Sequence, residues 1–173
     1  MSDKAKMDNP QATPSDPVVL MSTARIQRSI SRMAYQIAED NRDEQPITIV
    51  GLKKRGYAVA RQLSEQLKSL SNNEVTLVKP DQLNSNQVKN EFVVLVDDVI
   101  FSGTTMLEAI QTVFQNISPN TLRIAVLVDR GHRKMPVEAT FAGLDLPTKL
   151  DEHVRVEIKN KQAHRVLLTN ATH

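Results

Sequence analysis

Apolar positions along the chain follow two kinds of pattern. Three segments carry apolar residues three or four positions apart, the period of an amphipathic helix, and they are Ser22–Asp40, Gly56–Leu70 and Met106–Ile117. Between them lie short, nearly continuous apolar runs, at Pro46–Gly51, Glu74–Lys79, Glu91–Val99 and Leu122–Asp129. Uninterrupted runs of this length are typical of strands covered on both faces, so the order of segments predicts a parallel α/β sheet.

The two ends of the chain are patterned differently. Residues 1–17 are polar, contain three prolines and show no periodicity, which predicts a disordered N-terminal arm. Near the C-terminal end, short strands are expected at Val137–Gly143, Val154–Ile158 and Arg165–Leu168. No internal repeat or linker divides residues 18–173, which we expect to form one domain.

Composition narrows the class of protein. The chain has 173 residues, of which 40% are hydrophobic and 24% charged, and its net charge is +2, so any phosphate or nucleic-acid binding must use local patches. It has no cysteine, which fits a cytoplasmic location, and neither a membrane-spanning run nor a signal peptide is seen. Aromatic residues make up 3%, which argues against base-stacking platforms for single-stranded nucleic acid.

Two adjacent acids, Asp97 and Asp98, come directly after the buried run that begins at Phe92. The turn that follows them carries hydroxyls and a glycine, and it leads straight into the third helix. A helix N-terminus attracts anions, and carboxylates accept hydrogen bonds from vicinal hydroxyls. The unit therefore suits a ribose 5-phosphate, with the phosphate in the turn and the diol on the acids. The plainer interpretation is an acid that caps the helix and an ordinary turn.

The surrounding sequence favours the ligand interpretation. Neither the P-loop motif nor the dinucleotide fingerprint is present. Instead, the stretch Val93–Thr105 resembles the phosphoribosyl-pyrophosphate (PRPP) signature of type I phosphoribosyltransferases. Val126–Thr148 and Ile49–Leu63 are similar to segments of one branch of that family, the pyrimidine-operon regulators that are also uracil phosphoribosyltransferases. The resemblance covers about Ile26–Ile158 and implies a three-layer fold, with a mostly parallel central sheet and helices on both faces.

The resemblance assigns a role to each motif. The acid pair Asp97 and Asp98 would hold the ribose hydroxyls, with Arg133 as a third catalytic residue, in contact with pyrophosphate. The 5-phosphate would lie in the turn formed by Phe101, Ser102, Gly103, Thr104 and Thr105. Pyrophosphate would bind a loop made of Lys53, Lys54, Arg55 and Gly56, whose cations and backbone amides suit a tetra-anion. By itself, such a basic triplet is also explained by a solvated turn or a nucleic-acid patch.

The base end of the site would involve two further segments. In the family, residues matching Asp129 and Arg130 line it, and Phe141, Ala142 and Gly143 cover the base and read it through main-chain groups. Phe141 is equally explained as a core residue, and His132 is more simply a surface residue than a catalyst. The resemblance implies Mg²⁺ held mainly by PRPP oxygens and water, with Asp97 or Asp98 reaching it through water. It also implies a homodimer or larger homo-oligomer.

The sequence departs from the family between the second and third apolar runs. Relatives carry a long hairpin there with a mobile lid, whereas this chain has the short polar interval Lys79–Glu91, without tyrosine or arginine. We expect a reduced or lost lid, which weakens the expectation of turnover more than that of nucleotide binding. Phe101 stands where some purine-specific relatives have an aspartate, which favours a pyrimidine ligand or no base chemistry at all.

Three functions are therefore open. The chain could be an enzyme that makes UMP and pyrophosphate from uracil and PRPP. It could also be a weak or inactive PRPP- or UMP-binding regulator that binds RNA, or a subunit that binds a partner protein. The basic residues available for RNA phosphates are Arg25, Arg28, Arg32, Lys53–Arg55 and Arg130–Lys134. The first three arginines are more simply a solvated helix face.

Overall fold

The computed structural model describes residues 16–84 and 92–170. Its helices and strands follow in the order β1 Val18–Met21, α1 Thr23–Asp40, β2 Ile47–Gly51, α2 Lys53–Leu70, β3 Val75–Val78, η1 Pro80–Gln82, β4 Phe92–Ile100, α3 Thr104–Asn116, β5 Thr121–Asp129, β6 Phe141–Asp145, β7 Glu152–Lys159 and β8 Gln162–Asn170.

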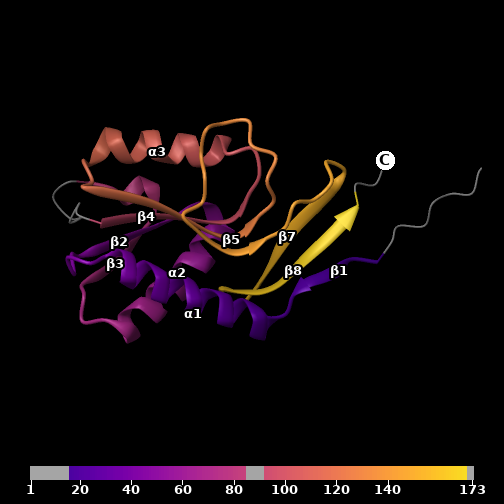
Figure 1. Ribbon diagram of the computed structural model, residues 1–173, viewed down its shortest axis with the longest axis horizontal. Helices are drawn as coiled ribbons and strands as arrows, with labels where there is room; N and C mark the ends of the chain where they lie inside the picture. Colours follow the sequence, from indigo (N-terminus) through magenta and orange to yellow (C-terminus); the bar gives the residue numbers. More distant parts are fainter. Residues whose placement is uncertain (1–15, 85–91, 171–173) are drawn as a thin grey trace, which may run out of the picture.

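A five-stranded parallel sheet forms the centre of the molecule, with the strand order β3-β2-β4-β5-β6. Helices α1 and α2 cover one face and α3 covers the other, which makes three layers (Figure 1). The predicted fold class is confirmed.

The central strand β4 shows why the apolar runs are continuous. Val94 and Val96 pack into the core shared with α1 and α2, whereas Val93 and Leu95 pack into the core shared with α3. Successive strand side chains point to opposite faces, so a strand covered on both faces needs an apolar residue at every position. Burial of both faces also fixes the register, in which Val96 lies between Gly51 of β2 and Ala125 of β5.

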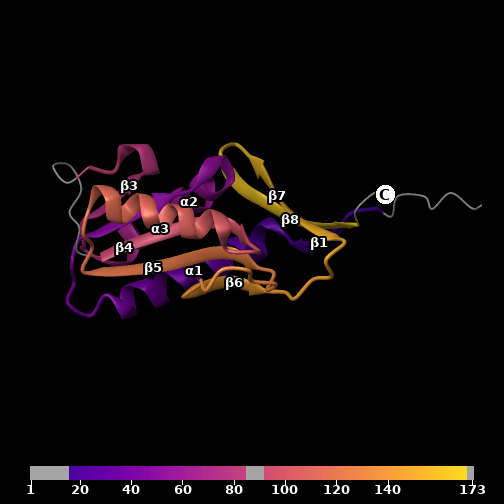
Figure 2. The same ribbon diagram turned by 90° about the horizontal axis from the view of Figure 1, so that it is seen from above.

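A second, antiparallel sheet of order β1-β8-β7 stands at one end of the parallel one (Figures 1 and 2). The expected strands at 154–158 and 165–168 are parts of β7 and β8, which are longer because they pair along their whole length as a hairpin. Of the expected strand at 137–143, only the end belongs to β6, which joins the parallel sheet. Strand β1 was not predicted.

The helix boundaries follow local capping. Ser22 is the N-cap of α1, and its hydroxyl accepts a hydrogen bond from the Arg25 amide at 3.3 Å. Helix α2 begins at Lys53, before the expected start at Gly56, so the predicted loop Lys53–Arg55 is wrong and these residues form the first helical turn. Its N-cap, Leu52, makes no side-chain cap bond, so the sequence has no cap signal at this start.

The predicted loop after β3 is described only in part. It contains the short 3-10 helix η1, whereas most of the expected lid region, residues 85–91, lies outside the described residues, as do residues 1–15 of the expected arm. In the described part of the chain, no helix has the length and apolar character needed to cross a membrane.

Candidate functional site

The residues predicted to bind the ribose and its 5-phosphate lie together near the carboxyl end of β4. Strand β4 continues to Ile100, so Asp97 and Asp98 lie within the strand, near its carboxyl end, as the expected strand Glu91–Val99 predicted. The first turn of α2 and the turn before α3 lie beside Asp97, and the loop after β5 is bound to that turn through Arg133. In open parallel sheets, ligands bind at this edge.

Asp97 is buried, with 6% of its surface exposed. Its Oδ1 atom accepts a hydrogen bond from the Asp98 amide at 2.9 Å. Burial, together with the neighbouring Asp98 carboxylate, raises the pKa of Asp97 from 3.8 to about 8, against a smaller lowering influence of Lys53. Without ligand, Asp97 therefore holds a proton at neutral pH, while the half-buried Asp98 is the more accessible acid of the pair.

Gly56 explains how α2 approaches the acid pair so closely. A Cβ atom added at this glycine would lie 2.7 Å from Oδ1 of Asp97 and 2.9 Å from its Cα. Real Cβ atoms do not come that near to another atom, so only glycine fits here. The structure shows Gly56 as the point where α2 contacts β4, and its predicted contact with pyrophosphate stays a prediction.

The predicted 5-phosphate turn has the geometry of an anion site. Gly103 has φ of +85° and precedes the first turn of α3, whose leading amides point into the turn. The Ser102 hydroxyl accepts from the Thr104 amide at 3.3 Å and lies 3.1 Å from the Thr104 hydroxyl. A hollow of about 110 Å³ is lined by Asp97 and residues 99–106.

Lys53 connects the two predicted anion sites. Its ammonium donates to the Thr105 hydroxyl at 3.3 Å, so the first residue of α2 reaches the first turn of α3. Lys53 also has φ of +51°, a left-handed conformation that is uncommon for a residue other than glycine.

The predicted basic triplet divides in the structure. Lys54 and Arg55 line a groove of about 510 Å³ with Arg155, Lys159 and Arg165 of the β7–β8 hairpin. Glu157 is the one acid on this groove, and it forms an ion pair with Arg165 at 2.9 Å. Lys54 and Arg55 thus face a broad basic surface, while Lys53 turns toward the acid pair.

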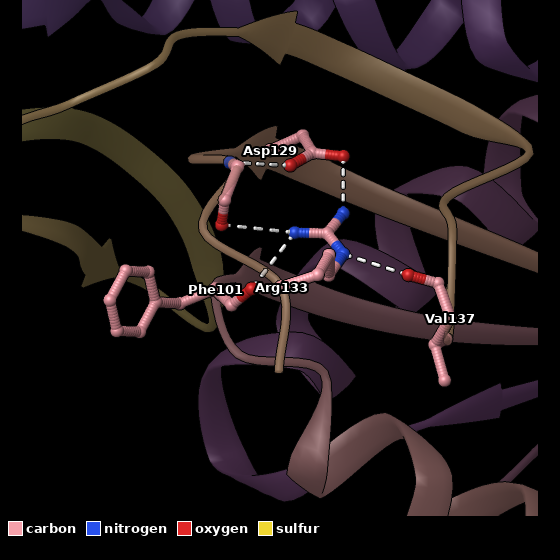
Figure 3. Close-up of polar contacts among 5 residues, drawn as sticks. Phe101, Asp129, Arg133 and Val137 are labelled. Carbon is pink, nitrogen blue, oxygen red and sulfur yellow. Dashed lines mark hydrogen bonds and ion pairs between the residues drawn. The ribbon is translucent and has the colours of Figure 1, made fainter. Parts of the chain in front are cut away.

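Arg133 holds the phosphate turn to the loop after β5 (Figure 3). Its guanidinium donates to the Phe101 carbonyl at 2.9 Å, to the Val137 carbonyl at 2.8 Å and to the Gly131 carbonyl at 3.3 Å. It also forms an ion pair with Asp129 at 2.5 Å. Four of its five N–H groups are therefore used inside the protein. These contacts give Arg133 a positioning role, and its predicted contact with pyrophosphate stays a prediction.

The two residues predicted at the base end are likewise engaged. Asp129 accepts from Arg133 and from the Gly131 amide at 2.9 Å. Arg130 is 7% exposed, stacks 4.6 Å above the Phe101 ring and donates to the Thr148 hydroxyl at 2.8 Å and to the Glu152 carbonyl. It therefore anchors the segment that connects the two sheets.

His132 and Phe101 form the outer wall of this region. The rings of the two residues lie 5.7 Å apart at an angle of 56°. Nε2 of His132 is 2.5 Å from the Thr148 carbonyl, and the residue has φ of +57°. The side chain is exposed and is held by Phe101 and Thr148, which places it at the rim of the site.

The segment predicted to cover the base has mixed roles. Phe141 is 7% exposed and packs in the core with residues of α1, so it is a core residue. Arg32 of α1 donates to the Ala142 carbonyl at 3.0 Å and to the Gly143 carbonyl at 2.9 Å. These contacts attach α1 to β6 and explain one of the arginines considered for RNA.

A further cavity adjoins the start of α2 and was not predicted. It measures about 610 Å³ and is lined by Gly51, Lys53, Lys54, Tyr57, Lys79, Pro80, Asp81 and Lys161. Four lysines from three separate segments meet at this cavity. Lys79 and Lys161 lie in polar stretches with no motif, so the only signal in the sequence was their charge.

The residues at the site fit a metal that arrives with its ligand. Among the described residues, no group of three or more His, Cys, Asp or Glu side chains could hold a metal ion. Mg²⁺ often keeps several waters and binds through substrate phosphates with one or two carboxylates. Asp97 and Asp98 supply that number of acids.

Comparison with known proteins identifies relatives over most of the chain. A family model described as the phosphoribosyl transferase domain matches residues 20–159. The curated relatives include the bifunctional protein PyrR of Leuconostoc mesenteroides, which is 33% identical and aligns over 86% of this chain and 97% of its own length. PyrR of Ligilactobacillus salivarius is 34% identical over 77% of this chain and 86% of its own length.

The alignment with the Leuconostoc relative reveals a difference in length. It runs over 169 positions but takes up 86% of this chain, or about 149 of its 173 residues. About twenty positions of that relative therefore have no counterpart in this chain.

Solved structures share the fold. Hypoxanthine-guanine phosphoribosyltransferase of Bacillus anthracis superposes with a TM-score of 0.65 at 22% identity, covering 89% of this chain and 97% of its own. The corresponding enzyme of Schistosoma mansoni, in complex with IMP, gives a TM-score of 0.70 at 18% identity, covering 90% of this chain and 83% of its own.

Proposed function

Because the chain belongs to the phosphoribosyltransferase family, we propose that it binds PRPP at the acid pair and transfers the ribose 5-phosphate group to uracil, forming UMP and pyrophosphate. The observation that carries this proposal is the meeting of three groups at one sheet edge. They are the acid pair of β4, the anion turn before α3, and Lys53, whose ammonium lies 3.3 Å from the Thr105 hydroxyl.

The proposed reaction exchanges one bond at the anomeric carbon of the ribose. The bond from this carbon to the pyrophosphate oxygen breaks, and pyrophosphate leaves with the electron pair. A ring nitrogen of the base forms the new bond and releases its proton to solvent. Positive charge develops on the sugar in between, so the protein must fix the ribose, stabilise the leaving group's charge and exclude water.

The side chains of this chain divide these tasks. Asp98 and Asp97 accept the ribose hydroxyls, and the turn from Phe101 to Thr105 holds the 5-phosphate through amides and hydroxyls. Lys53 offers its charge to both phosphate ends. Arg133, Asp129 and Arg130 keep the turn and the neighbouring loop in place. Mg²⁺ would supply charge to the leaving group, held by PRPP oxygens and, through water, by the acids.

The test of this proposal is a transferase assay with an independent binding measurement. Labelled uracil, PRPP and Mg²⁺ should yield labelled UMP, and parallel reactions with hypoxanthine and guanine test the choice of base. The double variant Asp97→Asn/Asp98→Asn should lose turnover and bind PRPP at least tenfold more weakly. Product from hypoxanthine and none from uracil would overturn the pyrimidine assignment. If the double variant binds PRPP as tightly as the unmodified chain, the acid pair is not the PRPP site.

Uracil as the base is supported by the resemblance to pyrimidine regulators, by PyrR relatives at about one-third identity and by Phe101 at the rim. Mg²⁺ dependence is checked in the same assay, because chelation of the ion should abolish UMP formation.

A second candidate function is that of a regulator that holds PRPP or UMP without turning it over and binds RNA or a protein. Two observations favour it. About twenty positions of the Leuconostoc relative are missing here, in keeping with the short interval after β3. The groove of Lys54, Arg55, Arg155, Lys159 and Arg165 presents cations suited to a phosphate backbone. UMP binding without UMP synthesis, together with salt-dependent binding of a pyrimidine-operon leader RNA, would select this function.

Light scattering would give the oligomeric state, for which we expect at least a dimer.

A further inference from the structure

The cavity beside the start of α2 gathers cations from three parts of the chain. Lys53 and Lys54 come from the first turn of α2, Lys79 from the end of β3, and Lys161 from the tip of the β7–β8 hairpin. The two views of the fold agree that this hairpin lies against α2 (Figures 1 and 2). We infer that Lys79 and Lys161 are pyrophosphate-binding residues of this protein, acting with Lys53 in place of the predicted Lys53–Gly56 loop. The inference rests on the proposed function.

The charge around this cavity is unbalanced. Four lysines line it, and Asp81 is the one acid among its lining residues. Among the described residues, every ion pair involves an arginine, and none of the four lysines pairs with a described acid. Like charges held around one space repel each other and are relieved by an anion. A group with three or four negative charges, such as pyrophosphate, matches this excess.

The position of the cavity suits the leaving group of PRPP. PRPP carries its two phosphate ends on opposite sides of the ribose. Lys53 lines this cavity and also donates to Thr105 of the 5-phosphate turn, so it stands between the two anion sites. Through Lys53 the cavity adjoins the 5-phosphate turn, and we infer that it receives the second phosphate end when the first lies in the turn. Its volume of about 610 Å³ is ample for pyrophosphate with its waters.

Two of the lysines at this cavity have an uncommon backbone conformation. Among the described residues, five other than glycine have positive φ, and two of them, Lys53 at +51° and Lys161 at +62°, line this cavity. Asn160 precedes Lys161 with φ of +52°, so two consecutive left-handed residues form the hairpin turn. Asparagine and glycine are the usual residues at such positions. A lysine there is uncommon, and observed strain of this kind clusters at ligand sites.

The wall of the cavity holds Lys79 in a defined place. Its ammonium lies 5.4 Å from the centre of the Tyr57 ring, within cation–π range, and Pro80 lies beside it. Lys79 is exposed, so its ammonium is open to an anion that enters the cavity from solvent.

The test measures pyrophosphate binding directly, by calorimetry with Mg²⁺ present. Lys161→Asn removes the ammonium but tolerates the left-handed turn, and Lys79→Met keeps the stem over Tyr57. Each should raise the Kd of pyrophosphate about fivefold, as expected for the loss of one partly screened charge, and the double variant more. Lys159→Met is the matched control, because Lys159 lies on the same hairpin but lines the other groove. The Kd of UMP should stay unchanged in all of them.

The outcomes separate this inference from the proposed function. If both variants bind pyrophosphate as tightly as the unmodified chain, or if Lys159→Met weakens it equally, Lys79 and Lys161 are not its ligands, whatever the transferase assay shows. If pyrophosphate binding depends on the two lysines but no UMP forms, the cavity is assigned and the enzymatic function fails. If the unmodified chain binds no pyrophosphate, the inference falls, and UMP formation then decides the function separately.

Discussion

Asp97 combines two properties that are in conflict in a protein without ligand. It is a carboxylic acid at a position with 6% exposure, and a second acid follows it directly. Both features disfavour the ionised form, which is why its pKa rises to about 8. A ribose diol and a nearby cation would supply the hydrogen bonds and the charge that the protein itself does not.

The pH dependence of stability should report on this acid. Between about pH 4 and pH 8 the folded chain keeps a proton on Asp97 that the unfolded chain has lost, so stability falls as pH rises through that window. Asp97→Asn removes this titrating group. The difference in free energy of unfolding between the variant and the unmodified chain should therefore shift in favour of the variant from pH 4 to pH 8, by on the order of 3 kcal/mol. Chemical denaturation at several pH values measures this.

The exposed Asp43 provides the control for that experiment. Asp43→Asn should leave the slope of stability against pH unchanged. Parallel slopes for Asp97→Asn and the unmodified chain would mean that Asp97 is ionised in the folded state.

Gly56→Ala tests the contact between α2 and β4. In a helix this change normally stabilises by about 1 kcal/mol, but here the new Cβ would lie 2.7 Å from Oδ1 of Asp97. The steric overlap should outweigh the gain in helix propensity, so the variant should be less stable by about 1–3 kcal/mol and should bind PRPP more weakly. Gln66→Ala, at an exposed position of the same helix, should be close to neutral. A stabilised Gly56→Ala variant would contradict the close contact.

At the scale of elements, the anion turn depends on a partner outside its own helix. The turn before α3 is short, and the Phe101 carbonyl within it is held by Arg133 from the loop after β5 (Figure 3). Amides of Lys134 and Met135 also donate to the Ser102 carbonyl, at 2.9 and 3.0 Å. The turn and the loop therefore behave as one unit.

Arg133→Gln should loosen that unit. The substitution removes hydrogen bonds to three carbonyls and the ion pair with Asp129, and it should lower stability by about 2–4 kcal/mol. It should also weaken UMP binding through the 5-phosphate turn. Hydrogen exchange of residues 101–105 should rise with it. Lys134→Gln removes the same charge at the next, exposed position and should change none of these. A turn that stays protected in Arg133→Gln would contradict this role.

The elements that were predicted are those whose pattern is local. The three helices and four parallel strands follow from apolar spacing that is visible within a single segment. Strand β1 was missed because its four residues have no alternation and become a strand only by pairing with β8. The first turn of α2 was missed because a left-handed Lys53 opens it without a capping side chain.

The site was predicted in part for the same reason. The acid pair and the turn from Phe101 to Thr105 form one contiguous motif, so their neighbourhood could be inferred. The internal partners of Arg130 and Arg133 could not, because they are carbonyls set by loop geometry. Lys79 and Lys161 could not be placed either, since a hairpin tip distant in sequence brings Lys161 to the cavity.

At the scale of the whole molecule, a few polar contacts connect the two sheets. Arg130, at the end of β5, reaches Thr148 and Glu152 on the segment that leads to β7. Gln62 of α2 accepts from the Ala163 amide of β8 at 2.8 Å, and Thr23 of α1 donates to the His164 carbonyl at 2.7 Å. These contacts fix the antiparallel sheet relative to the acid pair.

Arg130→Met tests this connection. Methionine retains much of the side-chain volume beside Phe101 but leaves the Thr148 and Glu152 oxygens without their donor, which should lower stability by about 2–3 kcal/mol. Limited proteolysis should then cut near residues 145–151 faster than in the unmodified chain. Arg155→Met, at an exposed position of β7, serves as control and should show neither effect. Unchanged proteolysis in Arg130→Met would mean that the apolar core alone holds the two sheets.

The pairing of β1 with β8 has a consequence for the order of folding. Val18 pairs with Leu168, so the first described strand meets the last one across nearly the whole chain. All five parallel strands end by Asp145, before β7 and β8 begin. During synthesis from the N-terminal end, the parallel sheet and its sugar-phosphate turn can form first, while β1 waits unpaired on the ribosome. The hairpin that carries Lys161 docks last, so a nascent chain acquires its acid pair before its full set of cations.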